Sequence, residues 1–295
     1  MKNKKFKNLT FYFVIIILLL IALTKFNVFK KEENFKILKV EKINKIFISD
    51  MYGNNIIIQK EIDKWTVNNK YEANLEIIER LISDLEKIEI KHPVSKNSIN
   101  TVTKEMAIKS VKFVFYDKDK ILKSFFVGGP TTDYLGTYMK NEKSQNIYVT
   151  HIPQHRGFLT PRFNIVLNQA KLSEWRSKKI INIKYKNIEE ISIDSKIIKN
   201  KNIIKNISKM ECSKFVTDDY DVDFLKDLKL TKPVKKITIK TKTGKQISIN
   251  LYNRYILDKS NVKILDKESM LGIIDNDLFI MQNNYMKKIL TQNNL

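Results

Sequence analysis

The sequence predicts an α+β protein with one N-terminal transmembrane helix, followed by two repeated subdomains with mainly antiparallel sheets and packed helices. Three observations predict this class. An uncharged apolar run opens the chain, short β-branched runs joined by turn-forming residues follow it, and stretches with apolar residues three and four positions apart lie between them. The chain has 295 residues, 43% of them hydrophobic, which is enough for two domains of ordinary size after the anchor.

The apolar run at residues 8–24 reads NLTFYFVIIILLLIALT and has a lysine on each side. Its length of about 17 residues corresponds to roughly 25 Å of helix, the short end of what crosses a bilayer. The run is apolar on every face, whereas a helix of a soluble protein keeps a polar face. We therefore expect a transmembrane helix over residues 8–24, with anchor positions that include Phe11, Ile16, Leu19 and Leu23.

A cleaved secretory signal is the alternative, because basic residues before an apolar run are typical of both. The residues that leave the run, Ile21 to Phe26, contain no small-x-small cleavage site and no cysteine to take a lipid. An uncleaved anchor in the inner (cytoplasmic) membrane is therefore predicted. Residues 1–7 form a cytoplasmic basic tail, and the bulk of the chain is extracytoplasmic or periplasmic.

Residues 25–42 are rich in lysine and glutamate and are predicted to be a stalk. The first α+β subdomain, with its connecting segment, is expected over residues 43–184. It begins with strands at 45–49, 55–59 and 65–67, and the first two are separated by the turn-forming Tyr52-Gly53-Asn54. Apolar residues between Leu75 and Ile88 recur at spacings of three and four, which predicts an amphipathic helix packed on the sheet.

Further strands of this subdomain are predicted at residues 111–116 and 121–127, joined by a turn at 117–120. A short helix is predicted at 102–108, before this hairpin. Gly128-Gly129-Pro130 ends the second of these strands, and two short extended pieces follow at 136–140 and 146–150. Residues 163–169 are predicted to be a short closing helix.

The second subdomain, residues 185–295, is expected to repeat this order in reduced form. The run IEEISI at 188–193 corresponds to KIFIS at 45–49, and the hairpin at 234–252, which turns at Lys242-Thr243-Gly244, corresponds to that at 111–127. Residues 197–207 are predicted to be strand-like and 222–228 helical. A strand at 277–281 and a terminal helix through Tyr285 and Leu290 complete the repeat.

The net charge of +22 and the pI near 9.7 are typical of nucleic-acid-binding proteins, but we do not predict that function. The basic residues are mostly lysines spread through a chain rich in Asn and Ile, as an AT-rich genome imposes, and an outward-facing domain meets no chromosomal DNA. The same charge is compatible with holding the domain near anionic lipid headgroups. The single cysteine, Cys212, is expected to be a buried structural thiol.

The sequence contains motifs that approach known sites without completing them. DDYDVD at 218–223 alternates carboxylates like a calcium loop, but Phe224 and Leu230 stand where the loop requires glycine and glutamate. His151 and His155 are spaced for zinc on a helix, but Pro153 lies between them. Gly128-Gly129 lacks the lysine of a phosphate loop. We therefore predict no catalytic residue, no metal site and no cofactor.

Arginine usage is distinctive, because three of the five arginines, Arg156, Arg162 and Arg176, fall within 21 residues. In a chain dominated by lysine, arginine indicates planar or bidentate pairing that lysine cannot replace. Together with Trp175, these residues are the candidate interaction surface or inter-subdomain joint. The structural interpretation is a guanidinium that ties the halves together, and the functional one is a surface for a ligand or partner.

The same region carries a family resemblance. The segment HIPQHRGFLTPRF at 151–163, then Glu174-Trp175-Arg176 and IEEISI, resembles the bacterial family called domain of unknown function 4340, of the Bacteroidetes type. Trp65 and the strand that ends in Gly128-Gly129 also resemble it, so the resemblance covers roughly residues 40–195. It implies a membrane-anchored envelope protein without an assigned activity, some members being encoded near ABC transporter and gliding-motility components.

We therefore expect a membrane-anchored extracytoplasmic binding or scaffolding module of the bacterial cell envelope, an accessory of an ABC transporter or of surface machinery. Its expected partners are the lipid bilayer, through the N-terminal helix, and an envelope protein. An envelope hydrolase acting on glycan or lipid and a purely structural tether are the alternatives. Paired carboxylates or a metal in a pocket would favour the hydrolase, and a chain with no pocket or large apolar patch would favour the tether.

Overall fold

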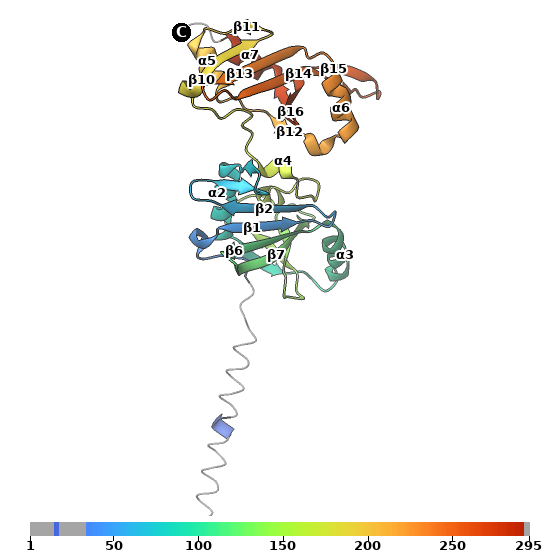
Figure 1. Ribbon diagram of the computed structural model, residues 1–295. Helices are drawn as coiled ribbons and strands as arrows, with labels where there is room; N and C mark the ends of the chain where they lie inside the picture. The colour runs from blue at the N-terminus through green and yellow to red at the C-terminus, as the bar shows by residue number, and fades with distance from the viewer. Residues whose placement is uncertain (1–14, 18–33, 292–295) are drawn as a thin grey trace, which may run out of the picture. The chain divides into compact units, whose positions relative to one another are not determined.

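The computed structural model describes residues 15–17 and 34–291 (Figure 1). Most of the predicted transmembrane helix at 8–24 lies outside these residues, including the anchor positions Phe11, Leu19 and Leu23, as do the basic tail and most of the stalk. Residues 15–17 are helical, and Ile16 is 56% exposed. Among the described residues, no helix has both the length and the apolar character needed to cross a membrane.

The α+β class with antiparallel sheets is confirmed. One sheet has the strand order β4-β3-β2-β1-β6-β7-β8-β9-β5, and the pairings given for it are antiparallel, such as Ile46 opposite Phe115 and Phe113 opposite Phe125. Its strands are β1 (Lys45–Ser49), β2 (Asn55–Lys60), β3 (Trp65–Val67), β4 (Tyr71–Glu72), β5 (Glu89–Pro93), β6 (Val111–Asp117), β7 (Lys120–Pro130), β8 (Thr137–Asn141) and β9 (Tyr148–His151).

Two of the helices predicted in this half are present. In α2 (Leu75–Leu85), Ile78, Leu81 and Leu85 are fully buried, as the spacing of three and four residues predicts. In α3 (Ile99–Lys109), Val102 and Met106 pack with Ile147 against one face of the sheet, where Phe126 and Tyr138 join them. A cluster of phenylalanines that includes Phe113, Phe125 and Phe163 fills the core of this half.

The second sheet has the order β11-β10-β13-β14-β15-β16-β12. Its strands are β10 (Ile188–Ile193), β11 (Lys196–Ile197), β12 (Lys214–Phe215), β13 (Lys235–Thr241), β14 (Gln246–Leu257), β15 (Lys263–Ile274) and β16 (Asp277–Gln282). Helices α5 (Lys201–Ile207) and α7 (Asn283–Thr291) cover one face through Ile207, Met286 and Ile289. Helix α6 (Val222–Leu230) packs on the residues of the other face, Tyr252, Leu271 and Ile273.

The two strand orders correspond position by position, as the predicted repeat requires. The series β2-β1-β6-β7-β8-β9-β5 of the first sheet matches β11-β10-β13-β14-β15-β16-β12 of the second, and the first sheet adds β3 and β4 at one edge. The hairpins predicted at 111–127 and 234–252 are β6–β7 and β13–β14, which occupy equivalent places. Gly244 has a φ of 80° in the turn of the second hairpin.

The chain divides into two compact units. The first contains the described residues up to Gly53 together with Arg80–Gln169, and the second contains Asn54–Glu79 together with the described residues from Ala170 onward. This division does not test the predicted subdomain limits, 43–184 and 185–295, which stay a prediction.

Two local predictions were wrong. Residues 197–207, predicted to be strand-like, form mostly α5, because the Asn200 side chain accepts hydrogen bonds from the N–H groups of Asn202 and Ile203 and caps the helix. Residues 163–169, predicted to be a helix, follow a short 3-10 helix at Thr160–Phe163. Asn164, Leu167 and Asn168 have positive φ angles, so the chain turns there instead of continuing as a helix.

Candidate functional site

The four residues predicted to form a joint occupy three different environments. Arg162 lies in the first unit and pairs with Asp84 of α2. Trp175 ends the short helix α4 (Leu172–Trp175) in the second unit, and Arg176 follows it directly. Arg156 is exposed on the loop after β9.

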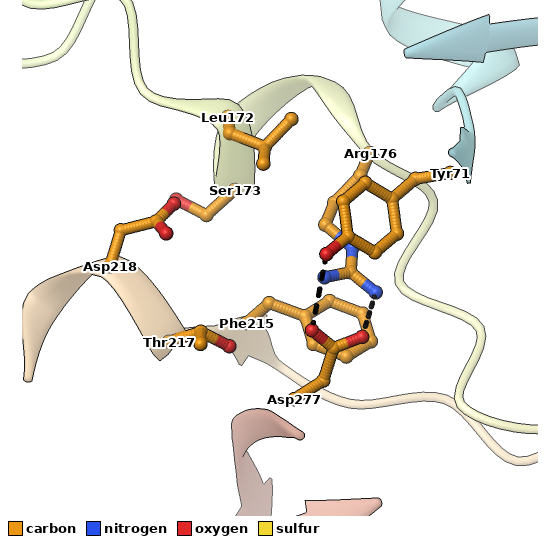
Figure 2. A pocket seen from close by; sticks show the side chains of 8 residues that line it. All are labelled: Tyr71, Leu172, Ser173, Arg176, Phe215, Thr217, Asp218 and Asp277. Atoms are coloured by element: carbon orange, nitrogen blue, oxygen red, sulfur yellow. Dashed lines mark hydrogen bonds and ion pairs between the residues drawn. The ribbon is translucent and has the colours of Figure 1, made fainter. Parts of the chain in front are cut away.

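Arg176 lies at the centre of a cluster whose other members are Tyr71, Phe215 and Asp277 (Figure 2). Its guanidinium carbon is 3.8 Å from the ring centroid of Tyr71 on β4 and 3.4 Å from that of Phe215 on β12. Its Nη2 donates a hydrogen bond of 3.0 Å to the Asp277 carboxylate, and the Tyr71 hydroxyl lies 3.4 Å from the other oxygen of Asp277. All four residues belong to the second unit.

The Arg176 cluster is mostly closed to solvent. Arg176 is 8% exposed, and the side chain of Asp277 is 23% exposed. A charge this deeply buried requires a partner of opposite sign, which Asp277 supplies, while the two rings replace water over the faces of the guanidinium. The arrangement explains why arginine is present, because a lysine ammonium cannot stack between two rings.

The cavity beside this cluster is small, with a volume of about 30 Å³. That volume is suited to a water molecule and is far below the usual size of a substrate pocket. Its lining consists of Tyr71, Leu172, Ser173, Arg176, Phe215, Thr217, Asp218 and Asp277. The cavity therefore leaves no room for a substrate-sized ligand beside Arg176.

Arg162 makes a bidentate pair within the first unit. Its Nε and Nη2 each donate a hydrogen bond of 2.6 Å to the two oxygens of Asp84. The carboxylate raises the pKa of Arg162, and the side chain of Asp84 is only 5% exposed. This is the planar pairing that lysine cannot reproduce.

Trp175 is 1% exposed, and its backbone carbonyl accepts a hydrogen bond of 2.8 Å from the N–H of Asn74, just before α2. Asn74 also caps the first turn of that helix, because its side chain accepts from the N–H of Ile77. Trp175 is therefore a core residue that positions the backbone at the start of α2, and it is not available at the surface.

An open groove lies in the first unit, with a volume of about 240 Å³. Lys91 donates a hydrogen bond of 2.7 Å from Nζ to the carbonyl of Leu135 across this groove. Asp133 accepts from the Thr131 hydroxyl and the Leu135 N–H, and these bonds lower the pKa of the Asp133 carboxyl. The lining residues are Lys91, His92, Val94, Ser95, Ser98, Thr131, Thr132, Asp133, Leu135, Gly136, Tyr138 and Val149.

The loop beside this groove presents a tyrosine and a leucine to solvent. Tyr134 is 61% exposed and Leu135 is 51% exposed, and the Tyr134 ring packs against that of Phe158 with 5.8 Å between centroids. Arg156 is two residues before Phe158, and Gly157 between them has a φ of 110°. We call Tyr134, Leu135, Arg156 and Phe158 the aromatic lip.

Sequence reasoning identified only Arg156 of the aromatic lip. Tyr134, Leu135 and Phe158 come from two loops that are brought together by the antiparallel order of β7, β8 and β9. Tyrosine, arginine and phenylalanine next to turn-forming glycines are a composition enriched in protein interfaces, and this signal was present in both loops.

The incomplete motifs have structural roles in the described chain. Asp221 of the acidic run caps α6, because its side chain accepts from the N–H of Phe224. His151 lies on β9 opposite Glu89, and Gly128-Gly129 lie within β7. Among residues 15–17 and 34–291, no group of three or more His, Cys, Asp and Glu side chains could hold a metal ion.

The expected burial of Cys212 is confirmed. The residue is 6% exposed, and burial raises the pKa of its thiol to about 12. The thiol is therefore protonated at neutral pH and is a poor nucleophile.

The fold is that of an α+β protein in which two antiparallel sheets share one strand order and arginine–carboxylate pairs hold segments together within each unit. Residues 65–202 match the family described as Domain of unknown function (DUF4340), which confirms the resemblance over those residues. The matched region contains Asp84, the aromatic lip, Arg162, Trp175 and Arg176, and it ends before Phe215 and Asp277. No curated protein and no solved structure matches the chain.

Proposed function

We propose that the chain is a membrane-anchored extracytoplasmic binding or scaffolding module of the bacterial cell envelope, working as an accessory of an ABC transporter or of surface machinery. Its partner is an envelope protein, and the partner-binding surface is the aromatic lip beside the groove of the first unit. The N-terminal apolar run holds the module at the inner membrane, with the bulk of the chain outside the cytoplasm.

The observation that carries this proposal is the contact of the exposed Tyr134 ring with the half-buried Phe158 ring, two residues after the exposed Arg156. Tyrosine and arginine are enriched among the few residues that carry most of the binding energy in protein interfaces, because each offers a large contact area together with a directional polar group. The Arg176 cluster supports the choice of the aromatic lip as the partner surface, because the cluster itself has a structural role. The Nη2 of Arg176 is bonded to Asp277 and its two faces are covered by the rings of Tyr71 and Phe215, so it fastens the fold.

The described residues favour a binding module over a glycan hydrolase. Glycoside hydrolysis uses a pair of carboxyl groups on either side of the bond that breaks. Asp133 is the one carboxylate among the described residues that line the groove. The purely structural tether is disfavoured by the groove itself and by the aromatic lip.

The test is an in-cell crosslinking pull-down of the full-length chain. The variant carries Tyr134→Asn and Arg156→Ala, since asparagine tolerates the φ of 58° at position 134. Lys120→Ala, an exposed change at the first residue of β7, is the matched control. Circular dichroism and thermal melting establish that the three proteins fold equally.

We expect the wild type and the control to recover the same envelope protein and the double variant to lose it. Recovery of no partner, or of the same partner with the double variant, would refute the aromatic lip as a binding surface. In-cell protease accessibility of the described residues tests the orientation separately, because a domain inside the cytoplasm is protected in spheroplasts.

A further inference from the structure

The two longest strands of the second sheet extend past their neighbours. β14 and β15 have 12 residues each, whereas β13 has 7 and β16 has 6. β13 pairs with β14 only up to Leu251, and β16 pairs with β15 only from Ser269 onward. Residues 255–265, which pair only with each other among the described residues, form what we call the free ribbon.

The free ribbon is apolar on both faces. Tyr255 stands opposite Leu265 on one face, and Ile256 stands opposite Ile264 on the other, because side chains alternate along a strand. A strand that covers a core is apolar on one face and polar on the other. The exposed fractions are 50% for Tyr255, 37% for Ile256, 64% for Leu257, 56% for Val262, 42% for Ile264 and 45% for Leu265.

The acidic groups of this region are engaged within the ribbon and its base. Asp258 in the turn accepts hydrogen bonds from the N–H groups of Ser260 and Val262. Asp266 at the base accepts from Arg254 and from the Ser269 hydroxyl. Lys259 and Lys263 remain exposed at the tip, and the ammonium of Lys263 lies 5.2 Å from the ring centroid of Tyr255.

We propose that the free ribbon inserts its tip into the interfacial layer of an anionic lipid bilayer. Exposed apolar residues on a monomer are normally scattered, but here six are contiguous on a ribbon that pairs with no other described strand. A bilayer contacts both faces of an inserted ribbon at once, whereas a flat protein surface covers one. The lysines at the tip and the net charge of +22 complement anionic headgroups.

The dimensions of the free ribbon fit this location. Three paired residues per strand at about 3.3 Å each span about 10 Å, close to the depth of about 5–10 Å that interfacial elements reach. The headgroup layer contains water, so the outer backbone edges of the ribbon stay solvated, which the hydrocarbon core would not allow. The proposal concerns a surface of the second unit and does not depend on the aromatic lip.

The test places an environment-sensitive fluorophore on the full-length chain at Leu257→Cys and mixes the protein with lipid vesicles. The native Cys212 is buried and protonated, so the new thiol is labelled selectively. The matched control carries the same label at Lys242→Cys, in the polar turn at the opposite end of β14. Because the readout is local, attachment of the N-terminal run to the vesicles cannot produce the signal.

We expect a blue shift at position 257, and quenching by spin-labelled lipids, in phosphatidylglycerol-rich vesicles, with a weaker response in phosphatidylcholine vesicles. The control label should not respond. Adding Ile256→Ser and Ile264→Ser to the labelled protein should abolish the shift, and these exposed changes leave the core intact. A label at 257 that stays water-like with both lipids overturns the proposal. A shift that needs no lipid and grows with protein concentration overturns it in favour of a second copy of the chain.

Discussion

At the scale of single residues, arginine is the most informative side chain in this protein. Three of the five arginines pair with a carboxylate: Arg162 with Asp84, Arg176 with Asp277 and Arg254 with Asp266. In each pair at least one partner is less than 10% exposed, so the carboxylate and the guanidinium depend on each other for solvation. We therefore expect the free energy of unfolding to fall by different amounts when one partner of a pair is replaced and when the other is.

The Arg162–Asp84 pair predicts such an asymmetry. Arg162→Ala leaves an almost fully buried carboxylate without its partner, and we expect it to lower the free energy of unfolding by about 3 kcal/mol. Asp84→Ala leaves a guanidinium that is 31% exposed and can be hydrated, so its effect should be about half as large. Lys36→Ala, in an exposed pair with Glu89, should cost less than about 1 kcal/mol. Urea denaturation measures all three, and equal effects at positions 84 and 162 would contradict the argument.

His151 predicts a pH dependence. Burial and the nearby Lys91 lower its pKa below the ordinary value of 6.5, while Glu89 opposes them. The unfolded chain therefore takes up a proton at a higher pH than the folded chain does, so stability falls as pH drops below about 6.5 and levels off below the folded pKa. Urea midpoints measured across this window should fall for the wild type and change less for His151→Gln. An unchanged slope in His151→Gln would count against this explanation.

At the scale of elements, the strands and helices follow their sequence patterns, and the departures have local causes. Helix α2 was predicted from its apolar spacing, and α5 was missed because its isoleucines favour a strand. The Asn200 cap and the i, i+3 and i+4 spacing of Ile203, Ile204 and Ile207 outweigh that preference. Glycine also has a specific role within one strand pair.

Gly272 on β15 lies directly opposite Phe279 on β16, and a Cβ at position 272 would be 2.1 Å from Cζ of that ring. Phe279 is fully buried, so Gly272→Ala forces the ring into the core and should cost about 1–3 kcal/mol of stability. Gly129→Ala is the matched control, because nothing lies within 4 Å of the added Cβ there. Thermal melting should separate the two variants, and a Gly272→Ala protein as stable as the control would refute the contact.

At the scale of the whole molecule, two sheets with one strand order are built from segments distant in sequence. Tyr71, Phe215 and Asp277 surround Arg176, and the hydroxyl–carboxylate contact between Tyr71 and Asp277 spans 206 residues of chain. Fixing such distant segments costs conformational entropy, which a single stacked and paired guanidinium helps to offset.

Arg176→Lys tests this role. Lysine can still reach Asp277 but cannot stack between Tyr71 and Phe215, so we expect a loss of about 1–3 kcal/mol in the unfolding of the second unit. Lys235→Ala, in the exposed pair with Asp194 of the same unit, should change stability by less than about 0.5 kcal/mol. Hydrogen exchange of the β12 and β16 amides reports the second unit directly. Wild-type protection in the lysine variant would mean that charge alone holds the cluster.

The sequence by itself determined the α+β class, the positions of most strands, the amphipathic helix α2 and the correspondence of the two hairpins. These properties are local, since alternation, apolar spacing and turn residues act over a few positions. It also indicated that the arginines near residues 156–176 are special. Only the tertiary structure decided their partners: Asp84 and Asp277 are 78 and 101 residues away from the arginines they bind. The aromatic lip and the free ribbon likewise emerged only from strand order and register, because a pattern within one segment does not say which other segment covers it.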